Sequence, residues 1–422
     1  MVKNNIKYYF TYDEIFKAYY DCMHNKKSTA NATKFSIDII EKLFTLCDEL
    51  NDNSYEIGSS ITFVVKFPVL REVFAADFRD RIVHHLIMNE LMIYFEKEFI
   101  SESFSCRKNK GVLYGIDTMY EHIKNCTDNY QKDAWILKMD IKSFFMSIDK
   151  NILVDLVDDL IVRLYPENRK KQRLRELCKQ IILHQPQLNC ERRGDLNLWK
   201  ELPKHKSLFN MPPDKGLAIG NLTSQIFANY YMNGLDHYIK EELGFKYYGR
   251  YVDDLMIVSD DKQKLLKAIL LIVKYAKDKL KLNMHPNKRY IQYYKNGVKF
   301  IGGVLKRKRK YVINRTRGSL IYKLKSYFKH YSPKKLEEFM MCVNSYLGFI
   351  GHFDSYNIRK EILTDKKLIG EWLPYIDIDT KNYRKINLKE NPNTKRIINV
   401  MEEIESVDNE DLNNKIIFNK II

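Results

Sequence analysis

An acidic pair inside an apolar run constrains this chain more than any other feature. Residues 246–258 read KYYGRYVDDLMIV, so Asp253 and Asp254 stand between two segments rich in β-forming residues. Adjacent carboxylates in an apolar setting are costly unless a cation compensates them. The pattern therefore predicts a β-hairpin whose tight turn presents both carboxylates at one place. Taken alone the string carries little weight, because an Asp pair in a turn more often serves ordinary turn chemistry.

A third carboxylate ends another apolar segment. Residues 134–142 read AWILKMDIK, and Asp140 closes their strand-like part. A lone Asp in such a place is usually a helix cap or a turn residue. Here a Gly-rich loop and a helical segment separate it from Asp253, an order of elements that favours the meeting of three carboxylates. Three carboxylates can hold two divalent ions roughly 3.5–4 Å apart, and Mg²⁺ prefers such oxygen ligands.

The composition narrows the class of protein. A length of 422 residues, 45% of them hydrophobic, predicts more than one domain. The net charge of +17 points to a polyanionic partner, although charge alone is equally compatible with a merely basic soluble protein. Seven scattered cysteines without a C-x-x-C pair favour reduced thiols over a zinc ribbon. We expect a cytoplasmic location, because we see neither a signal peptide nor a membrane span.

Local patterns give a coarse outline of the elements. We expect helices before residue 61 and at 71–98, 222–243 and 262–280, with two more at 318–331 and 333–350. Strands are expected at 61–69, around 134–142 and around 290–313. The proline-containing stretch 165–215 is interpreted as an insertion, and the charged stretch 376–422 as a loosely docked tail.

Several motifs follow one another in a familiar order. The segments LKMDIKSFF, GLAIGNLTSQ, YVDDLMIV, LNMHPNK and VKFIGG resemble, in sequence and order, the palm motifs of reverse transcriptases. The resemblance covers roughly residues 61–360 and is strongest to prokaryotic enzymes of diversity-generating retroelements. Further similar segments are REVFAADFRDRIVHH, FSCRKNKGV, WKELPKHKSLF and SYLGFIGHFDSYNIRK.

The resemblance implies an α+β fold, a right-hand polymerase with fingers, an antiparallel-sheet palm and a helical thumb. The expected regions are an N-terminal helical extension (1–60), fingers (61–133), a palm (134–312, with the insertion 165–215), a thumb (313–375) and the charged C-terminal tail (376–422).

The resemblance also implies roles for single residues. Asp140, Asp253 and Asp254 are the expected catalytic and metal-binding carboxylates, with Ile141 beside them, and two Mg²⁺ ions are the expected cofactor. The expected nucleotide-binding residues are Lys66, Arg71, Phe145, Ile219, Gly220, Gln225 and Lys288. The expected nucleic-acid-binding residues are Tyr251, Gly302, Lys306, Arg307 and Lys308.

Four of these roles have plainer alternatives. Phe145 stands where the family places an aromatic gate against the ribose 2′-hydroxyl, but it also suits an ordinary core. Arg71 offers a fork to phosphate oxygens, yet it and Lys66 also suit a solvated basic face. Lys288 matches a lysine proposed to protonate pyrophosphate, or it is a surface lysine. The basic run 306–310 is either a phosphate contact at the primer grip or a solvated turn.

The loop before the helix at 222 departs from the pattern Q-G-x-x-x-S-P of this polymerase group. Ile219 replaces the usual Gln and Gln225 the usual Pro, while Gly220 is expected to allow close approach of the backbone. An apolar side chain cannot hydrogen-bond the nucleotide, so we expect lowered fidelity unless Ile219 simply packs in the core.

The expected function is synthesis of cDNA from an RNA template, error-prone and within a diversity-generating retroelement. The alternative is a reverse transcriptase of phage defence that copies its own non-coding RNA. A non-catalytic RNA-binding protein fits less well because the three aspartates are intact. Expected partners are template RNA, cDNA and dNTPs, together with a small basic accessory protein; a homo-oligomer is left open.

Overall fold

The computed structural model describes residues 9–24, 30–66 and 69–390. The chain forms two compact units, Met1–Gln292 and Tyr293–Ile422, and each is described by itself. The first unit carries the hairpin at 246–258. None of the helices in these described ranges is long and apolar enough to cross a membrane.

A four-stranded sheet of order β5-β6-β3-β7 forms the centre of the first unit. Its strands are β3 (Trp135–Asp140), β5 (Tyr247–Tyr251), β6 (Asp254–Ser259) and β7 (Tyr290–Tyr293). Strand β6 pairs antiparallel with both β5 and β3, which confirms the predicted hairpin. Beyond Asp254 every residue of β6 is buried, so helices cover both faces of this sheet.

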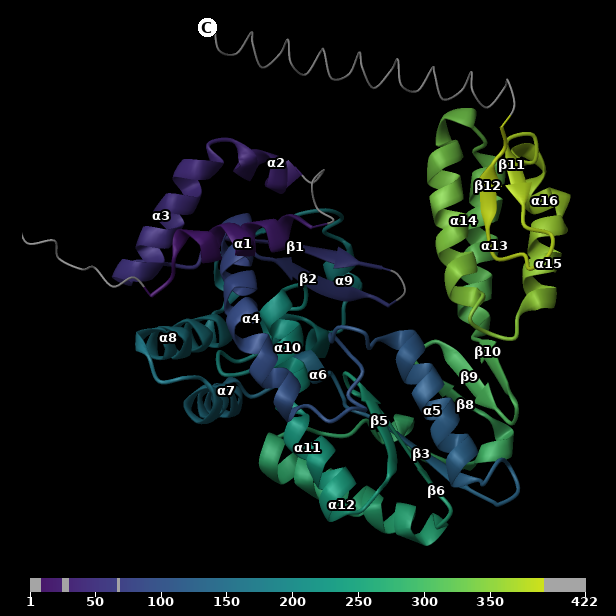
Figure 1. Cartoon of the computed structure of the whole chain (residues 1–422), viewed down its shortest axis with the longest axis horizontal. Helices are drawn as coiled ribbons and strands as arrows, with labels where there is room; N and C mark the ends of the chain where they lie inside the picture. Colours follow the sequence, from purple (N-terminus) through teal and green to yellow (C-terminus); the bar gives the residue numbers. More distant parts are fainter. Residues whose placement is uncertain (1–8, 25–29, 67–68, 391–422) are drawn as a thin grey trace, which may run out of the picture. The chain divides into compact units, whose positions relative to one another are not determined.

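Alternation along β5 shows which helix covers which face. Gly249 faces α5 (Val112–Cys126), where an added Cβ would lie 2.4 Å from the sulfur of Met119. Tyr248 points to the opposite face and donates a hydrogen bond to Asp236 of α11 (Asn233–His237). Helix α12 (Lys262–Leu280) packs against β6 and has the predicted bounds. Figure 1 shows this sheet with its helices.

Helices enclose the remaining core of the first unit. Helix α4 packs against α1 and α10, and α7 packs against α8. The segment expected to be helical, 222–243, consists of α10, α11 and a π-helical turn at Tyr238–Glu242. The further bounds are α1 (Tyr12–Met23), α2 (Ala30–Ser36), α3 (Ile39–Asp52), α4 (Phe78–Glu98), α6 (Phe144–Ser147), α7 (Lys150–Leu164), α8 (Arg169–Leu183) and α10 (Leu222–Tyr231).

The structure corrects the helix predicted over 71–98. Residues Arg71–Ala75 form strand β2, antiparallel to β1 (Ser60–Val65), and α4 begins only at Phe78. The alternation in REVFA buries Glu72 and Phe74 on one face, which is the pattern of a strand. Asp77 then caps α4 by accepting a hydrogen bond from the Arg79 amide.

The stretch 165–215 is more integrated than the insertion we expected. Besides α8 it contributes β4 (Cys190–Arg192), which pairs parallel with β1, and the short helix α9 (Leu198–Glu201). The buried carboxylate of Glu72 accepts hydrogen bonds from Trp199 Nε1, Ser207 Oγ and the Leu208 amide at 2.7–2.9 Å. These bonds fix the segment to the β2-β1-β4 sheet.

The second unit combines a small meander with helices. Strands β8 (Val298–Phe300), β9 (Gly303–Lys306) and β10 (Arg309–Val312) pair antiparallel. The two predicted helices are present as α13 (Asn314–Lys329) and α14 (Leu336–Ile350), and two shorter helices follow, α15 (Tyr356–Thr364) and α16 (Lys366–Ile369). Trp372, fully buried, stacks on Phe339 with ring centroids 4.3 Å apart.

The first residues of the stretch 376–422, which we expected to be a loosely docked tail, are folded into the second unit. Strands β11 (Ile376–Ile378) and β12 (Ile386–Leu388) form an antiparallel pair. Asn344 of α14 both donates to the Ile386 carbonyl and accepts from its amide, each at 2.9 Å. Residues 376–388 therefore belong to the second unit, while 391–422 lie outside the described residues.

Candidate active site

The hairpin turn brings the three predicted carboxylates together. In the ladder of β3 and β6, Asp140 stands directly opposite Asp254, and Tyr251 stands opposite Asp254 on the other side. Residues directly opposite one another in antiparallel strands point to the same face. Asp253 lies in the intervening turn and its charge interacts with both other carboxylates.

Two lysines supply countercharge at this place. Lys138 precedes Asp140 by two positions, so it shares its face, and its buried ammonium forms an ion pair with Asp254 Oδ1. The Lys288 ammonium lies 3.0 and 3.2 Å from the two carboxylate oxygens of Asp140. Lys288 is 57% exposed and Asp140 19% exposed, so this second pair borders solvent.

The segment 283–288 carries Lys288 to Asp140. The Lys142 amide donates to the Asn283 carbonyl at 2.9 Å, and the His285 amide donates to the Asp140 carbonyl at 2.7 Å. The buried residue Ile141, expected at the metal, lies between these bonds and forms a β-bridge with Met284. A 3₁₀ turn at Pro286–Lys288 follows, which explains why the motif lysine reaches the carboxylate.

Burial and mutual repulsion perturb the acidic turn. Burial, with the charges of Asp140 and Asp254 adding to it, raises the pKa of Asp253 to about 6. Burial also raises the pKa of Asp254, although the adjacent Lys138 ammonium offsets part of this effect. Both shifts mean that the negative charges are poorly compensated and that an additional cation would be favoured here.

The donor set fits a divalent cation, although the present arrangement does not enclose one. Within the described ranges, no three His, Cys, Asp or Glu side chains surround one point closely enough to hold a metal ion. Lys138 and Lys288 hold two of the three carboxylates instead. No hydrogen bond of normal geometry reaches the buried Asp254 Oδ1 from the described residues. Hard carboxylate oxygens of this kind suit Mg²⁺.

The loop 216–221 is fixed against β2 and α6. The Phe74 amide donates to the Ile219 carbonyl and the Leu217 amide to the Phe145 carbonyl, each at 2.8 Å. Gly220 has a φ of +124°, and a Cβ there would lie 2.6 Å from the Phe74 carbonyl oxygen. Glycine is therefore required for the approach to β2, a reason that differs from the expected approach to the nucleotide.

The predicted nucleotide-binding residues in and around this loop differ in their exposure to solvent. Phe145 and Ile219 are half-buried and pack against the small apolar cluster formed by Phe74, Met146, Leu208 and Ala218. Gln225 is exposed, and its side-chain carbonyl accepts a contact from Cys106 Sγ at 3.4 Å. Part of the Ile219 side chain is therefore packed in the core, as one of the two alternatives for this residue expected.

Other predicted residues lie elsewhere. Lys66 and Arg71 are exposed at the loop end of the β1-β2 hairpin, on a sheet separate from that of the aspartates. Lys66 Nζ lies 4.0 Å from Glu201. In the second unit, Gly302 (φ +97°) turns the chain between β8 and β9, whereas Lys306, Arg307 and Lys308 surround the turn between β9 and β10.

Three buried charged residues beside the site escaped the sequence analysis. Arg250 and Asp236 form an ion pair with no solvent exposure on either side chain. Lys138 is the third. Its spacing of two residues from Asp140 in a predicted strand could have indicated that both side chains lie on the same face. For Arg250 the signal was a lone charged residue within the apolar segment before the turn.

Comparison with known families assigns the chain to a class. The model of the family "Reverse transcriptase (RNA-dependent DNA polymerase)" matches residues 70–305, more than half of the chain. The chain belongs to this reverse transcriptase family and has its α+β polymerase fold. Reverse transcriptase domains generally use divalent metal ions, usually Mg²⁺. The comparison with curated proteins finds no significant match.

Similar solved structures include two yeast telomerases. Telomerase from Candida albicans in complex with a fragment of telomeric RNA has 12% sequence identity and a TM-score of 0.43, over 75% of this chain and 55% of that chain. Apo telomerase from Candida tropicalis has 13% identity and a TM-score of 0.46, over 74% of this chain and 60% of that chain. The chain thus spans little more than half the length of the structures it matches.

Proposed function

We propose that this protein synthesises DNA on an RNA template by in-line phosphoryl transfer at Asp140, Asp253 and Asp254. The observation that carries the proposal is the convergence of these carboxylates at the β5-β6 turn, where two lysines compensate their negative charge only in part. Two Mg²⁺ ions, when bound, would activate the primer 3′-hydroxyl and neutralise charge on the triphosphate. Asp140 and Asp253 would hold both ions, with Asp254 and the backbone at Ile141 beside them.

Two flanking residues are proposed to act on the nucleotide. Lys288, held at Asp140 by an exposed ion pair, would exchange this carboxylate for the phosphates and protonate the leaving pyrophosphate. The half-buried ring of Phe145 would exclude a ribose 2′-hydroxyl and favour dNTPs. Arg71 and, more weakly, Lys66 would contact the triphosphate from the β1-β2 hairpin.

The nucleic acid is proposed to contact further residues. Tyr251, partly buried beside Asp254, and Gly220 would border the nucleotide and template. Gly302, Lys306, Arg307 and Lys308 would contact the primer backbone, since exposed basic turns suit phosphate.

We further propose that the enzyme is error-prone and serves a diversity-generating retroelement. Ile219 has no hydrogen-bonding side chain, and its carbonyl is used by Phe74, so the loop offers no polar check at this position. Misincorporation opposite template adenine, measured for the native enzyme and Ile219→Gln, tests the idea. The Gln variant is expected to make fewer errors there, and equal error spectra would contradict the proposal.

Primer extension on an RNA template with Mg²⁺ tests the polymerase activity itself. The native protein is expected to extend the primer and Asp253→Asn to fail, whereas equal yields from both proteins would refute the assignment. Sequencing of copurified RNA and cDNA then tests the biological role. Products changed at adenines support the retroelement, while cDNA of one structured non-coding RNA supports phage defence.

A further inference from the structure

A buried arginine lies behind the acidic turn. Arg250 stands opposite Leu255 in the ladder, whereas its neighbour Tyr251 stands opposite Asp254. Neighbouring residues of a strand point to opposite faces, so Arg250 lies on the face opposite to Asp140 and Asp254. Its side chain is fully shielded from solvent. Arg250 is therefore placed to touch neither metal nor substrate.

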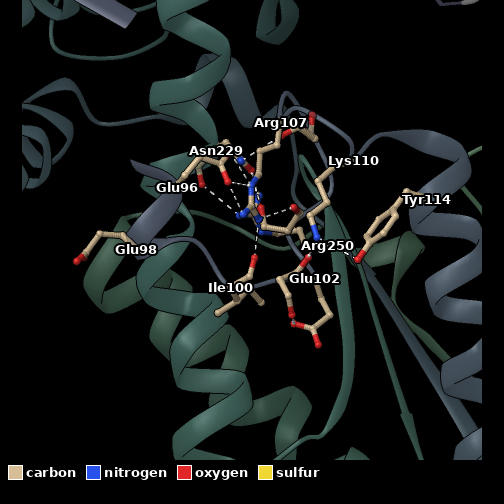
Figure 2. A network of polar contacts seen from close by, with 12 residues as sticks. Glu96, Glu98, Ile100, Glu102, Arg107, Lys110, Tyr114, Asn229 and Arg250 are labelled. Carbon is tan, nitrogen blue, oxygen red and sulfur yellow. Dashed lines mark hydrogen bonds and ion pairs between the residues drawn. The ribbon is translucent and has the colours of Figure 1, made fainter. Parts of the chain in front are cut away.

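The guanidinium of Arg250 reaches the turn from this hidden side. Its Nη1 donates to the Val252 carbonyl at 2.8 Å and to Asn229 Oδ1 at 2.9 Å. Nε and Nη2 donate to the two carboxylate oxygens of Asp236 at 2.7 and 2.5 Å. Nη2 also contacts the Asn229 carbonyl and Ser103 Oγ, at 3.1 and 3.2 Å. All three nitrogens thus have partners, as Figure 2 shows in part.

The residue held by this contact has an unfavourable backbone conformation. Val252 has a φ of +57°, in the left-handed region that β-branched residues rarely adopt. Such a conformation persists only when the surroundings determine it. The bond from Arg250 to the Val252 carbonyl lies next to Asp253, so any relaxation of Val252 would displace that carboxylate.

The surroundings of Arg250 are themselves rigidly tied. The Arg250 amide donates to the Glu102 carbonyl at 3.0 Å, and its carbonyl accepts from the Phe104 amide at 2.9 Å. Arg107 fixes the same loop to α4 by contacts with Glu96 at 2.7–3.0 Å, and it also donates to the carbonyl of Ile100, just beyond the end of α4, at 2.6 Å. Figure 2 shows Arg107 and Arg250 close together within this network.

We propose that Arg250 is a positioning residue that holds Val252 in the left-handed conformation and thereby fixes the place of the adjacent Asp253 beside Asp140 and Asp254, so that these carboxylates can bind a divalent cation together. This inference rests on the proposed function, because it assigns a purpose to the geometry of the three carboxylates. The plainer alternative is a buried ion pair that only stabilises the fold. The two roles can be distinguished in a variant that loses the ion pair but still folds. Metal binding should weaken if Arg250 positions the turn, and it should stay unchanged if the pair only stabilises the fold.

The central variant replaces the whole ion pair, Arg250→Met with Asp236→Leu. Exchange of a buried ion pair for apolar residues of similar volume often keeps the fold, and it removes the hold on Val252. Three quantities are measured on the full chain: Mg²⁺ affinity by calorimetry, hydrogen exchange of the peptide 250–256, and primer extension. Arg173→Met is the matched control, since it removes another buried arginine, which lies on α8 and donates a hydrogen bond to the carbonyl of Leu50 on α3.

We expect the folded double variant to bind Mg²⁺ about 10–100-fold more weakly, and to lose about 100-fold in kcat. Its 250–256 peptide should exchange faster, whereas Arg173→Met should change none of the three. Adding Val252→Gly supplies a residue that tolerates positive φ. It should therefore restore part of the Mg²⁺ affinity of the double variant, an effect absent if the pair serves stability alone.

Native Mg²⁺ affinity and native exchange in a folded double variant would overturn the positioning role. If that variant does not fold, Arg250→Lys is the test instead, because lysine keeps a cation beside Asp236 without the planar fork. Native Mg²⁺ affinity in Arg250→Lys would equally overturn the positioning role. A native protein that extends no primer, but whose Mg²⁺ binding responds as expected, would refute the proposed function and leave the positioning role standing.

Discussion

Two ion pairs flank the acidic turn on opposite faces of one sheet, and they differ in almost every respect. Arg250 and Asp236 are shielded completely from solvent, whereas Lys288 leaves 57% of its side chain exposed while it holds Asp140. The guanidinium of Arg250 has a partner for each nitrogen, whereas the ammonium of Lys288 is paired, among the described residues, with the two oxygens of one carboxylate. We therefore expect the hidden pair to persist and the exposed pair to exchange more readily.

The same comparison explains where the charge of the site is left unbalanced. Behind the sheet Asp236 is paired with the fixed guanidinium of Arg250, and several hydrogen bonds offset the cost of removing both charges from water. In front, three carboxylates share two lysines, and burial raises the pKa of Asp253 to about 6. The front face is therefore the one on which an additional cation would be favoured.

The largest effect is expected from Asp253→Asn on the front face. It removes one proposed cation ligand with little change of shape, so primer extension should fall about 1,000-fold or more. The assay compares kcat on an RNA template with that of Asp260→Asn, which alters an exposed carboxylate next to the far end of β6. Activity retained by the Asp253 variant would remove the basis of the front-face interpretation.

Breaking the hidden pair should cost the most stability. Asp236→Asn leaves the Arg250 charge buried without its partner, and we expect a loss of about 3–5 kcal/mol in the free energy of unfolding. Asp158→Asn breaks the partly exposed pair with Arg175 and should cost at most about 1 kcal/mol. Chemical denaturation measures both, and equal losses would show that burial does not distinguish the pairs.

Glu72 sharpens the comparison, because hydrogen bonds from an indole, a hydroxyl and a backbone amide hold this buried acid. Glu72→Gln keeps its shape but replaces one acceptor by a donor, so about 1–3 kcal/mol of stability should be lost. Limited proteolysis should then cut more readily within 195–211. Unchanged proteolysis would mean that these bonds do not fix the segment.

The raised pKa of Asp253 gives a pH dependence of definite sign. The folded chain binds this proton more tightly than the unfolded chain between about pH 4 and 6. The stability from protonated Asp253 is therefore present at low pH and lost as the pH rises through about 6. The free energy of unfolding, measured in EDTA from pH 5 to 7.5, should show this pH-dependent loss in the native protein and not in Asp253→Asn. Parallel curves would contradict it.

The smallest effect is expected from Lys288→Met. An ion pair with one largely exposed partner contributes about 0–1 kcal/mol, so the unfolding free energy should barely change. Because Lys288 competes with a cation for Asp140, Mg²⁺ should bind slightly more tightly in the variant. Calorimetry at low ionic strength measures this, and markedly weaker Mg²⁺ binding would show that Lys288 supports the cation site.

The sequence predicts those elements in which one hydrophobic period, helical or strand-like, continues over the whole segment. The hairpin at 246–258 and the helix at 262–280 follow directly from their patterns. Strand β2 was missed because its five alternating residues run almost without a break into a long helix, so the helical period dominates. The role of 165–215 was missed because parallel pairing of β4 with β1 depends on contacts remote in sequence.

The sequence predicted which carboxylates form the site. It did not predict the buried residues that hold them in place. Apolar flanks and order along the chain indicated that Asp140 and Asp253 would meet. The pairing of Arg250 with Asp236 joins a strand to a helix, and no periodicity within either element reports it. For Gly220 the sequence indicated a close approach but not its object, the Phe74 carbonyl. The catalytic roles of all these residues stay predictions.

The lysines at the carboxylates imply an order of events during loading. Lys138 and Lys288 already occupy oxygens of Asp254 and Asp140. A divalent ion bound between these acids would compete with the two ammonium groups, so we expect cation binding to be coupled to release of a lysine. Lys288 would then be released beside the proposed place of the triphosphate, so the cation-free protein would already hold the cationic group that the proposed substrate needs.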